Sequence, residues 1–337
     1  MEKQLDYWSN KKIYKKKMYE LWKKKIYLYA TVPLFILKIR IRGQNVKMKL
    51  NHPEDDDRGK ARAKKEKYEK FFKDIVKVYN NLDCYVYLIV NDHVTTDKAY
   101  IDKEVYYSDK KNAKIKRNNR FFEEINHYPF FSIVKPPHSN LICIPDAMFI
   151  QNYSKWSRVS NLPLKDYVKK VNKTEKYHWK NKNNKFVFKS QYWKYKEINP
   201  IVSSKIENHD TTDKYLSIKG QIKNKYLLGS FLRWDTTYWQ LLSNSVLFII
   251  DGIHDSTLNT HPYLYKSFLS YYFNPYEHYI PIKLSEIDKV NETLENKDNY
   301  LKKVSENATR KASKLTYEKV HTYFGRLLVK YNKIYNS

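Results

Sequence analysis

Residues 225–250 read KYLLGSFLRWDTTYWQLLSNSVLFII, an apolar run, a polar link, a helical pattern and a second apolar run. We expect strands over residues 226–228 and 246–250, with a helix over residues 236–242 between them. A strand, a helix and a second strand in succession form the repeating unit of a parallel sheet with right-handed crossovers. The stretch therefore predicts the α/β fold class.

The same alternation continues on both sides of this stretch. Strands are expected at residues 186–188 and 279–282, and helical patterns fill residues 285–331. In the first half of the chain, a helical pattern at 59–81 precedes an uninterrupted apolar run at 85–90, which is typical of a buried parallel strand. Shorter strands are expected within residues 34–50, 130–134 and 141–144.

A polar segment at residues 154–185 ends in the low-complexity run KNKNNK and marks a change between two domains. The length of 337 residues also fits two domains better than one. We expect an N-terminal domain over residues 1–155 and a C-terminal domain over residues 156–315. A C-terminal helix over residues 316–337 is expected to pack back onto the first domain.

The net charge is +28, from 64 Lys and Arg residues against 36 Asp and Glu residues. Such an excess suits an anionic partner, but only ten of the cations are arginine, the residue that reads phosphates and bases in a bidentate way. The chain is also rich in Asn, Tyr and Ile, so a compositional bias toward AT-rich codons is the favoured interpretation of the lysines. We expect no specific nucleic-acid partner. A basic nucleic-acid-binding protein without catalytic activity is the alternative function.

The charged N-terminus has no apolar core of a secretory signal, and the longest apolar run, residues 26–37, is too short to span a bilayer. Cys84 and Cys143 lie in strand-like runs and predict no disulfide framework. The chain also ends without an ER-retention tail. We expect a cytoplasmic protein, in the host cytosol if the chain is viral. The basic helical pattern at residues 11–25 adds the expectation of peripheral contact with an anionic membrane.

Several nucleotide and metal motifs are absent from the sequence. With six glycines it contains neither GxGxxG nor a P-loop, and it has no HExxH. The only formal match to the DxD pair that binds a divalent ion is Asp55-Asp56-Asp57, in a charged segment that we interpret as a solvated turn. We therefore expect no metal and no cofactor.

A different anion site is suggested by Arg233-Trp234-Asp235-Thr236-Thr237. A cation and two hydroxyls at the start of a helix can bind a diphosphate through charge and free backbone amides. An ordinary helix N-cap at Asp235 or Thr236 is the alternative, and it is the one that the sequence alone favours.

Segments spread over residues 85–310 resemble glycosyltransferase family 90, which includes protein O-glucosyltransferases and capsule-associated proteins. The similar segments are KYLL at 225–228, WQLLSNSVLF at 239–248, YEHYIPIK at 276–283, PFFS at 129–132 with IPD at 144–146, and FVFKS at 186–190 with NP at 199–200. The order and spacing of these segments carry the resemblance more than any one of them.

The resemblance implies a GT-B fold, in which two Rossmann-like domains face each other across a cleft. It also implies an inverting, metal-independent transfer of a sugar, glucose or xylose, from a UDP-sugar to a glycan or glycoprotein acceptor. The first domain would hold the acceptor and the second the donor. The residues implied for donor binding are Arg233, Thr236, Thr237, Lys189, Ser190 and Trp234.

This sequence departs from the family pattern at three places. Lys189 and Ser190 replace the arginine and glycine of the family's FxRGS segment, and Thr236 occupies the position of another arginine. The catalytic acidic residue of the family, its general base, follows a strand-end Asn by three positions, which here is Val94. The general base is then Asp92, directly after Asn91, or Asp97, if three residues are inserted. An inactive relative is the alternative that these departures leave open.

Overall fold

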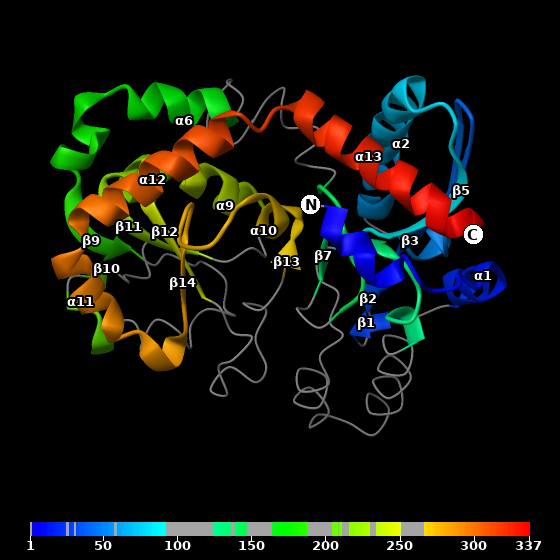
Figure 1. Ribbon diagram of the computed structural model, residues 1–337, viewed down its shortest axis with the longest axis horizontal. Helices are drawn as coiled ribbons and strands as arrows, with labels where there is room; N and C mark the ends of the chain where they lie inside the picture. Colours follow the sequence, from blue (N-terminus) through cyan, green and yellow to red (C-terminus); the bar gives the residue numbers. More distant parts are fainter. Residues whose placement is uncertain are drawn as a thin grey trace. The chain divides into compact units, whose positions relative to one another are not determined.

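The computed structural model describes residues 2–24, 27–29, 32–56, 59–91, 124–135, 139–146, 164–187, 204–207, 209–210, 216–229, 234–250 and 266–337 (Figure 1). The chain divides into two compact units. Unit 1 comprises Met1–Gln151, Lys266–Phe268 and Tyr317–Ser337, and unit 2 comprises Asn152–Tyr265 and Leu269–Thr316. Each unit contains a five-stranded sheet with parallel neighbours, so the expected α/β class is confirmed.

Unit 1 is built on a mixed sheet in the order β4-β3-β5-β6-β8. The hairpin of β3 and β4 is antiparallel, β3 also pairs antiparallel with β5, and β5, β6 and β8 run parallel. Gly43, with φ of 55°, begins the two-residue hairpin turn, where a left-handed backbone favours glycine. The strands of unit 1 are β1 (Tyr27–Tyr29), β2 (Val32–Pro33), β3 (Ile36–Arg42), β4 (Asn45–Leu50), β5 (Asp83–Ile89), β6 (Phe131–Ser132), β7 (Val134–Lys135), β8 (Ile142–Cys143) and β13 (Lys266–Ser267).

Two long helices pack against this sheet and against each other. α2 (Lys60–Val78) contacts β4, and α13 (Tyr317–Asn336) contacts α2 and β5, so Tyr317–Ser337 belongs to unit 1 (Figure 1). Phe71 and Phe324 stack with ring centroids 5.5 Å apart. A side chain at Gly325 would meet the Tyr79 ring, with a Cβ only 2.0 Å from Cε2, so this close helix contact requires glycine. The remaining helical segments are η1 (Glu2–Trp8), α1 (Lys15–Lys23) and η2 (Pro53–Asp55).

Unit 2 is built on a sheet of five parallel strands in the order β10-β9-β11-β12-β14. Numbered along the chain, this is the order 2-1-3-4-5 of doubly wound α/β sheets. The strands are β9 (Asn183–Val187), β10 (His209–Asp210), β11 (Asn224–Gly229), β12 (Val246–Ile250) and β14 (Ile280–Ile282). The helices are α6 (Leu164–Asn172), η4 (Glu175–Tyr177), η5 (Trp179–Asn181), α8 (Ile218–Ile222), α9 (Trp234–Leu241), α10 (Phe268–Tyr272, which starts in unit 1), η10 (Leu284–Glu286), α11 (Lys289–Asn296) and α12 (Asp298–Ser313).

The stretch at residues 225–250 folds as its pattern predicts. β11, α9 and β12 follow one another, and β11 and β12 pair in parallel with Tyr226 opposite Val246. Side chains of β9, β11, β12 and β14 build the core with α12, including Phe186 and Phe248, whose ring centroids lie 5.2 Å apart. Among the described helices, none is long and apolar enough to cross a lipid bilayer.

Candidate functional sites at the two sheet edges

The carboxyl ends of β9 and β11 lie side by side in unit 2. Val187, the last residue of β9, pairs with Leu227, and β11 ends two residues later at Gly229. The direction of winding changes at this pair, because β10 lies on one side of β9 while β11, β12 and β14 lie on the other. Doubly wound sheets bind their ligands outside the carboxyl ends at such a switch point. This edge is therefore the candidate ligand site of unit 2.

The sequence-predicted donor residues follow these two strand ends. Lys189 and Ser190 come two and three residues after β9, and Arg233 comes directly before α9, which follows β11. These three residues lie outside the described part of the chain. The strand order thus brings the ends of two strands that are about forty residues apart to the same edge, which their sequences alone do not specify.

Thr236 and Thr237 lie in the first turn of α9, where backbone amides have no partner within the helix. Thr236 is half-buried, whereas the Thr237 side chain is fully buried. Thr236 is thus the hydroxyl of the pair with access to solvent. For Trp234 the structure describes only the backbone, so its stacking role is untested.

Gly229 and Gln240 form a close contact at the end of β11 that the sequence did not reveal. A Cβ added to Gly229 would lie 2.5 Å from Oε1 of Gln240 and 2.9 Å from Cδ1 of Leu247. Nε2 of Gln240 donates a long hydrogen bond of 3.5 Å to the Leu228 carbonyl. Gln240 is 3% exposed, and its Oε1 accepts no hydrogen bond from the described residues. The only sequence signal for this contact is a glycine at the end of an apolar run.

The opposite, amino edge of the same sheet is held by Lys182. Its Nζ donates hydrogen bonds to the carbonyls of Ile222 and Ser243, each at 2.8 Å, and to Oγ of Ser245 at 2.7 Å. These partners lie at the starts of β11 and β12, and Lys182 itself precedes β9. Burial lowers the pKa of Lys182 to about 7. The LSNS part of the family-like segment therefore has a structural role, away from the candidate ligand edge.

Unit 1 gathers polar groups at the carboxyl edge of its parallel strands. Asn91 follows β5 and accepts a hydrogen bond at Oδ1 from the Phe35 amide at 2.7 Å. Nζ of Lys64, from α2, donates to the Val90 carbonyl at 2.7 Å. One turn further along α2, the Tyr68 hydroxyl donates to the carbonyl of Pro145, which follows β8, at 2.9 Å. The first half of α2 therefore connects the ends of β5 and β8.

A buried carboxylate and a half-buried lysine interact electrostatically at this edge. Asp146 is 4% exposed, and it acts electrostatically on Lys67 of α2. Partial burial lowers the pKa of Lys67, and the negative charge of Asp146 opposes that shift. Sequence reasoning noted Asp146 only as part of a family-like segment. A Pro-Asp pair directly after an apolar run could have identified it as a strand-end carboxylate.

Asp92 and Asp97, the two predicted general bases, lie outside the described residues. Asn91, immediately before Asp92, stands at the carboxyl end of β5. β5 thus ends at the edge where Lys64, Lys67 and Asp146 gather.

Asp56, in the run of aspartates at 55–57, does not lie on a solvated turn. Asp56 is 4% exposed and caps α2, because its Oδ1 accepts from the Ala61 amide at 3.2 Å and its Oδ2 accepts from the Arg62 amide at 2.8 Å. The prediction of a solvated turn is therefore wrong for Asp56. The physical reason is that the backbone amides in the first turn of α2 need hydrogen-bond acceptors, which the Asp56 carboxylate supplies. Asp57 lies outside the described residues.

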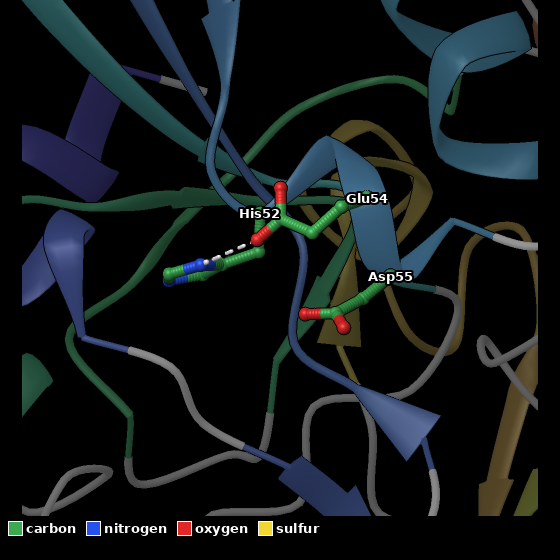
Figure 2. A group of neighbouring side chains, drawn as sticks. All are labelled: His52, Glu54 and Asp55. Atoms are coloured by element: carbon green, nitrogen blue, oxygen red, sulfur yellow. Dashed lines mark hydrogen bonds and ion pairs between the residues drawn. The ribbon is translucent and has the colours of Figure 1, made fainter.

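His52, Glu54 and Asp55 form a group beside this cap, on the segment between β4 and α2 (Figure 2). One ligand-type atom from each lies within 4.8 Å of the others. Nδ1 of His52 is 3.3 Å from Oε1 of Glu54, and its Nε2 is 3.1 Å from the Lys23 carbonyl. Both ring nitrogens thus have partners within the protein, and we assign no metal to this group.

No protein-family model matches the chain, and no curated protein matches it. The likeness to glycosyltransferase family 90 therefore rests on the quoted segments alone.

Proposed function

We propose that the chain is an inverting, metal-independent glycosyltransferase of GT-B architecture. It would move glucose or xylose from a UDP-sugar to a hydroxyl of a glycan or glycoprotein acceptor. The observation that carries the proposal is the switch point between β9 and β11 in unit 2. It supports a nucleotide site because both predicted donor-binding segments begin at these two strand ends.

The donor side of the proposal depends on neutralising a diphosphate without a metal ion. Lys189 and Arg233 supply positive charge, and the amino end of α9 supplies the positive end of the helix dipole beside the Thr236 hydroxyl. Such groups stabilise the negative charge that develops on the leaving UDP. Gly229 would keep the end of β11 free of a side chain next to this site.

The acceptor side is assigned to unit 1, with Asp97 or Asp92 as the general base. The acceptor oxygen attacks the anomeric carbon while its proton passes to the aspartate carboxylate, because a neutral alcohol is a poor nucleophile. The bond from the anomeric carbon to the diphosphate oxygen breaks, and UDP leaves with the electron pair. Attack on the face opposite the leaving group inverts the configuration.

A thermal melt with UDP tests the donor assignment. A ligand that binds only the native state at about a hundred times its Kd adds about 2.7 kcal/mol to the free energy of unfolding, so UDP should raise the Tm. The same shift should persist in EDTA, with CMP as the control nucleotide. UDP-glucose and UDP-xylose are then compared by the release of UDP in the presence of acceptor glycans. Absence of any shift with UDP would contradict the donor site, and a shift that EDTA abolishes would contradict the metal-free mechanism.

A further inference from the structure

One face of the β3–β4 hairpin in unit 1 is covered with cations. β3 buries Leu37, Ile39 and Ile41 on one face of the sheet and places Lys38, Arg40 and Arg42 on the other. β4 adds Lys47 and Lys49 to the same face, where Lys49 is opposite Lys38 and Lys47 is opposite Arg40. Like charges directly opposite each other in an antiparallel pair destabilise the sheet. Folding alone therefore does not account for this pattern.

The helix α1 extends the same surface through aromatic rings. Nζ of Lys38 lies 4.5 Å from the centroid of the Tyr19 ring and 4.4 Å from that of Trp22. Lys23 of α1 also lies over Tyr19, at 4.5 Å, and Lys49 approaches Trp22 at 5.9 Å. The cations of the helix and of the hairpin thus form one continuous surface. We call it the basic face, and it comprises Lys23, Lys38, Arg40, Arg42, Lys47 and Lys49.

The charge of the chain is concentrated in this region. Residues 11–50 contain thirteen Lys or Arg residues and a single acidic residue, Glu20. A uniform codon bias would spread lysines along the chain without removing the acidic residues from one segment. On the basic face, Asp83 pairs with Arg40, while Lys23, Arg42, Lys47 and Lys49 are exposed to solvent. A local excess of this kind attracts an anionic partner.

The chemistry of the basic face favours a lipid surface over nucleic acid. Proteins bind single strands by stacking bases on exposed aromatic rings, but here Lys23, Lys38 and Arg40 already lie over the rings of Tyr19 and Tyr85. Four of the six cations are lysines, which act as point charges and do not form the bidentate contacts that read bases. Exposed lysines on a broad face suit the phosphate and carboxylate groups of anionic lipids.

The apolar side of α1 is not available for insertion into a bilayer. Met18, Leu21 and Trp22 are buried within unit 1, and Nε1 of Trp22 donates to the Ile36 carbonyl at 3.0 Å. Binding through this region would therefore be electrostatic, with the fold unchanged. We propose that the basic face docks the protein on a membrane that contains anionic lipids. This inference is independent of the proposed transferase activity.

Sedimentation with vesicles tests the proposal on the full chain. We expect binding to phosphatidylcholine vesicles that contain phosphatidylserine, none to pure phosphatidylcholine, and loss of binding as salt is raised. The variant Lys23→Gln, Lys47→Gln, Lys49→Gln should weaken binding about a hundredfold, since each lysine near an anionic surface contributes about a fivefold increase in affinity. Unchanged thermal melting would show that the variant is folded.

A matched control removes the same charge from unit 2. Lys219, Lys297 and Lys303 are exposed, and the variant with all three changed to Gln has the same net charge as the first variant. It should keep nearly the full affinity for the vesicles. Equal losses in both variants, or no binding to phosphatidylserine vesicles, would overturn the proposal. The proposal would also be overturned if the protein bound a single-stranded RNA tightly but did not bind vesicles, and the first variant lost the RNA binding. That result would assign the face to nucleic acid.

Discussion

β3 in unit 1 and β12 in unit 2 each lie between two other strands, yet their side chains are buried differently. All five residues of β12 are buried, whereas in β3 Lys38, Arg40 and Arg42 reach solvent between buried Leu and Ile residues. A parallel strand covered on both faces has only its ends available for a ligand, while an antiparallel hairpin can keep one face in water. Unit 2 therefore has a candidate site at the carboxyl edge of its sheet. Unit 1 has a candidate site at its carboxyl edge and a second candidate surface on the basic face of the β3–β4 hairpin.

The largest expected effect is on the transfer rate. It distinguishes the acceptor edge proposed for unit 1 from the donor edge proposed for unit 2. Asp97→Asn or Asp92→Asn in unit 1 should lower the transfer rate about 10²–10⁴-fold, because a general base is lost, while UDP affinity is retained. On the family-like spacing we expect Asp97 to be the base and the Asp92 variant to keep most of its activity. Transfer assays with a verified acceptor, together with UDP titrations, make the measurement.

Arg233→Ala in unit 2 is the converse variant and should weaken UDP binding. If both aspartate variants remain fully active, the base is elsewhere and the assignment of the acceptor to unit 1 fails. If Arg233→Ala leaves UDP binding unchanged, the donor edge is wrong instead.

The next effect is on stability. It compares Gly325 in unit 1 with Gly229 in unit 2, where an added Cβ would overlap a neighbouring side chain. Gly325→Ala should destabilise the protein by about 3 kcal/mol, because its Cβ would overlap the rigid Tyr79 ring. Gly229→Ala should cost only about 1 kcal/mol, because the overlapping atoms are the ends of the Gln240 and Leu247 side chains, which can move. The Gly229 variant should lower UDP affinity, and the Gly325 variant should not. Urea denaturation and UDP titration measure the two effects.

Gly220 provides a control for both glycine variants. It lies in α8 without a positive φ, and an added Cβ would meet the Leu216 side chain at 3.3 Å. Gly220→Ala should be close to neutral, since the helix propensity gained offsets the tight contact. A larger cost for Gly229→Ala than for Gly325→Ala would contradict the comparison.

The last effect concerns the amino edge of unit 2 and appears only as a change of stability with pH. The pKa of Lys182 is about 7 in the folded protein and about 10.5 in the unfolded chain, so between these values the unfolded chain binds more protons. The free energy of unfolding should therefore rise by about 2 kcal/mol from pH 7 to pH 9, relative to the variant Lys182→Met. Parallel urea titrations at the two pH values measure the difference.

UDP affinity serves as the control for this variant, because Lys182 lies at the edge opposite the candidate donor site. It should be the same in Lys182→Met and in the unmodified protein. Equal pH dependence in both proteins would mean that Lys182 keeps its charge within its three hydrogen bonds.

The alternation of strand and helix could be read from the sequence because periodicity is local. The continuous apolar run VLFII indicated a strand buried on both faces, and β12 is fully buried. The predicted helix at 59–81 corresponds to α2, whose Phe71, Phe72 and Ile75 enter the core. Among the predicted site residues, Thr236 and Thr237 are the ones whose side chains the structure describes. Asp92, Asp97, Lys189, Ser190 and Arg233 stay predictions, as does the role of the Trp234 ring.

By itself, the sequence predicted the strands and helices that have a clear hydrophobic period, such as β12 and α2, since these depend on patterns within a few residues. It did not predict α6 or the start of β9, which lie in the polar segment at residues 154–185. Tertiary structure alone decided the strand order that joins the ends of β9 and β11 at one edge. It also decided that Lys182 holds Ser245, 63 residues away, at the opposite edge. The physical reason is that a buried amine must find acceptors wherever packing places them, and no local pattern specifies contacts over such separations.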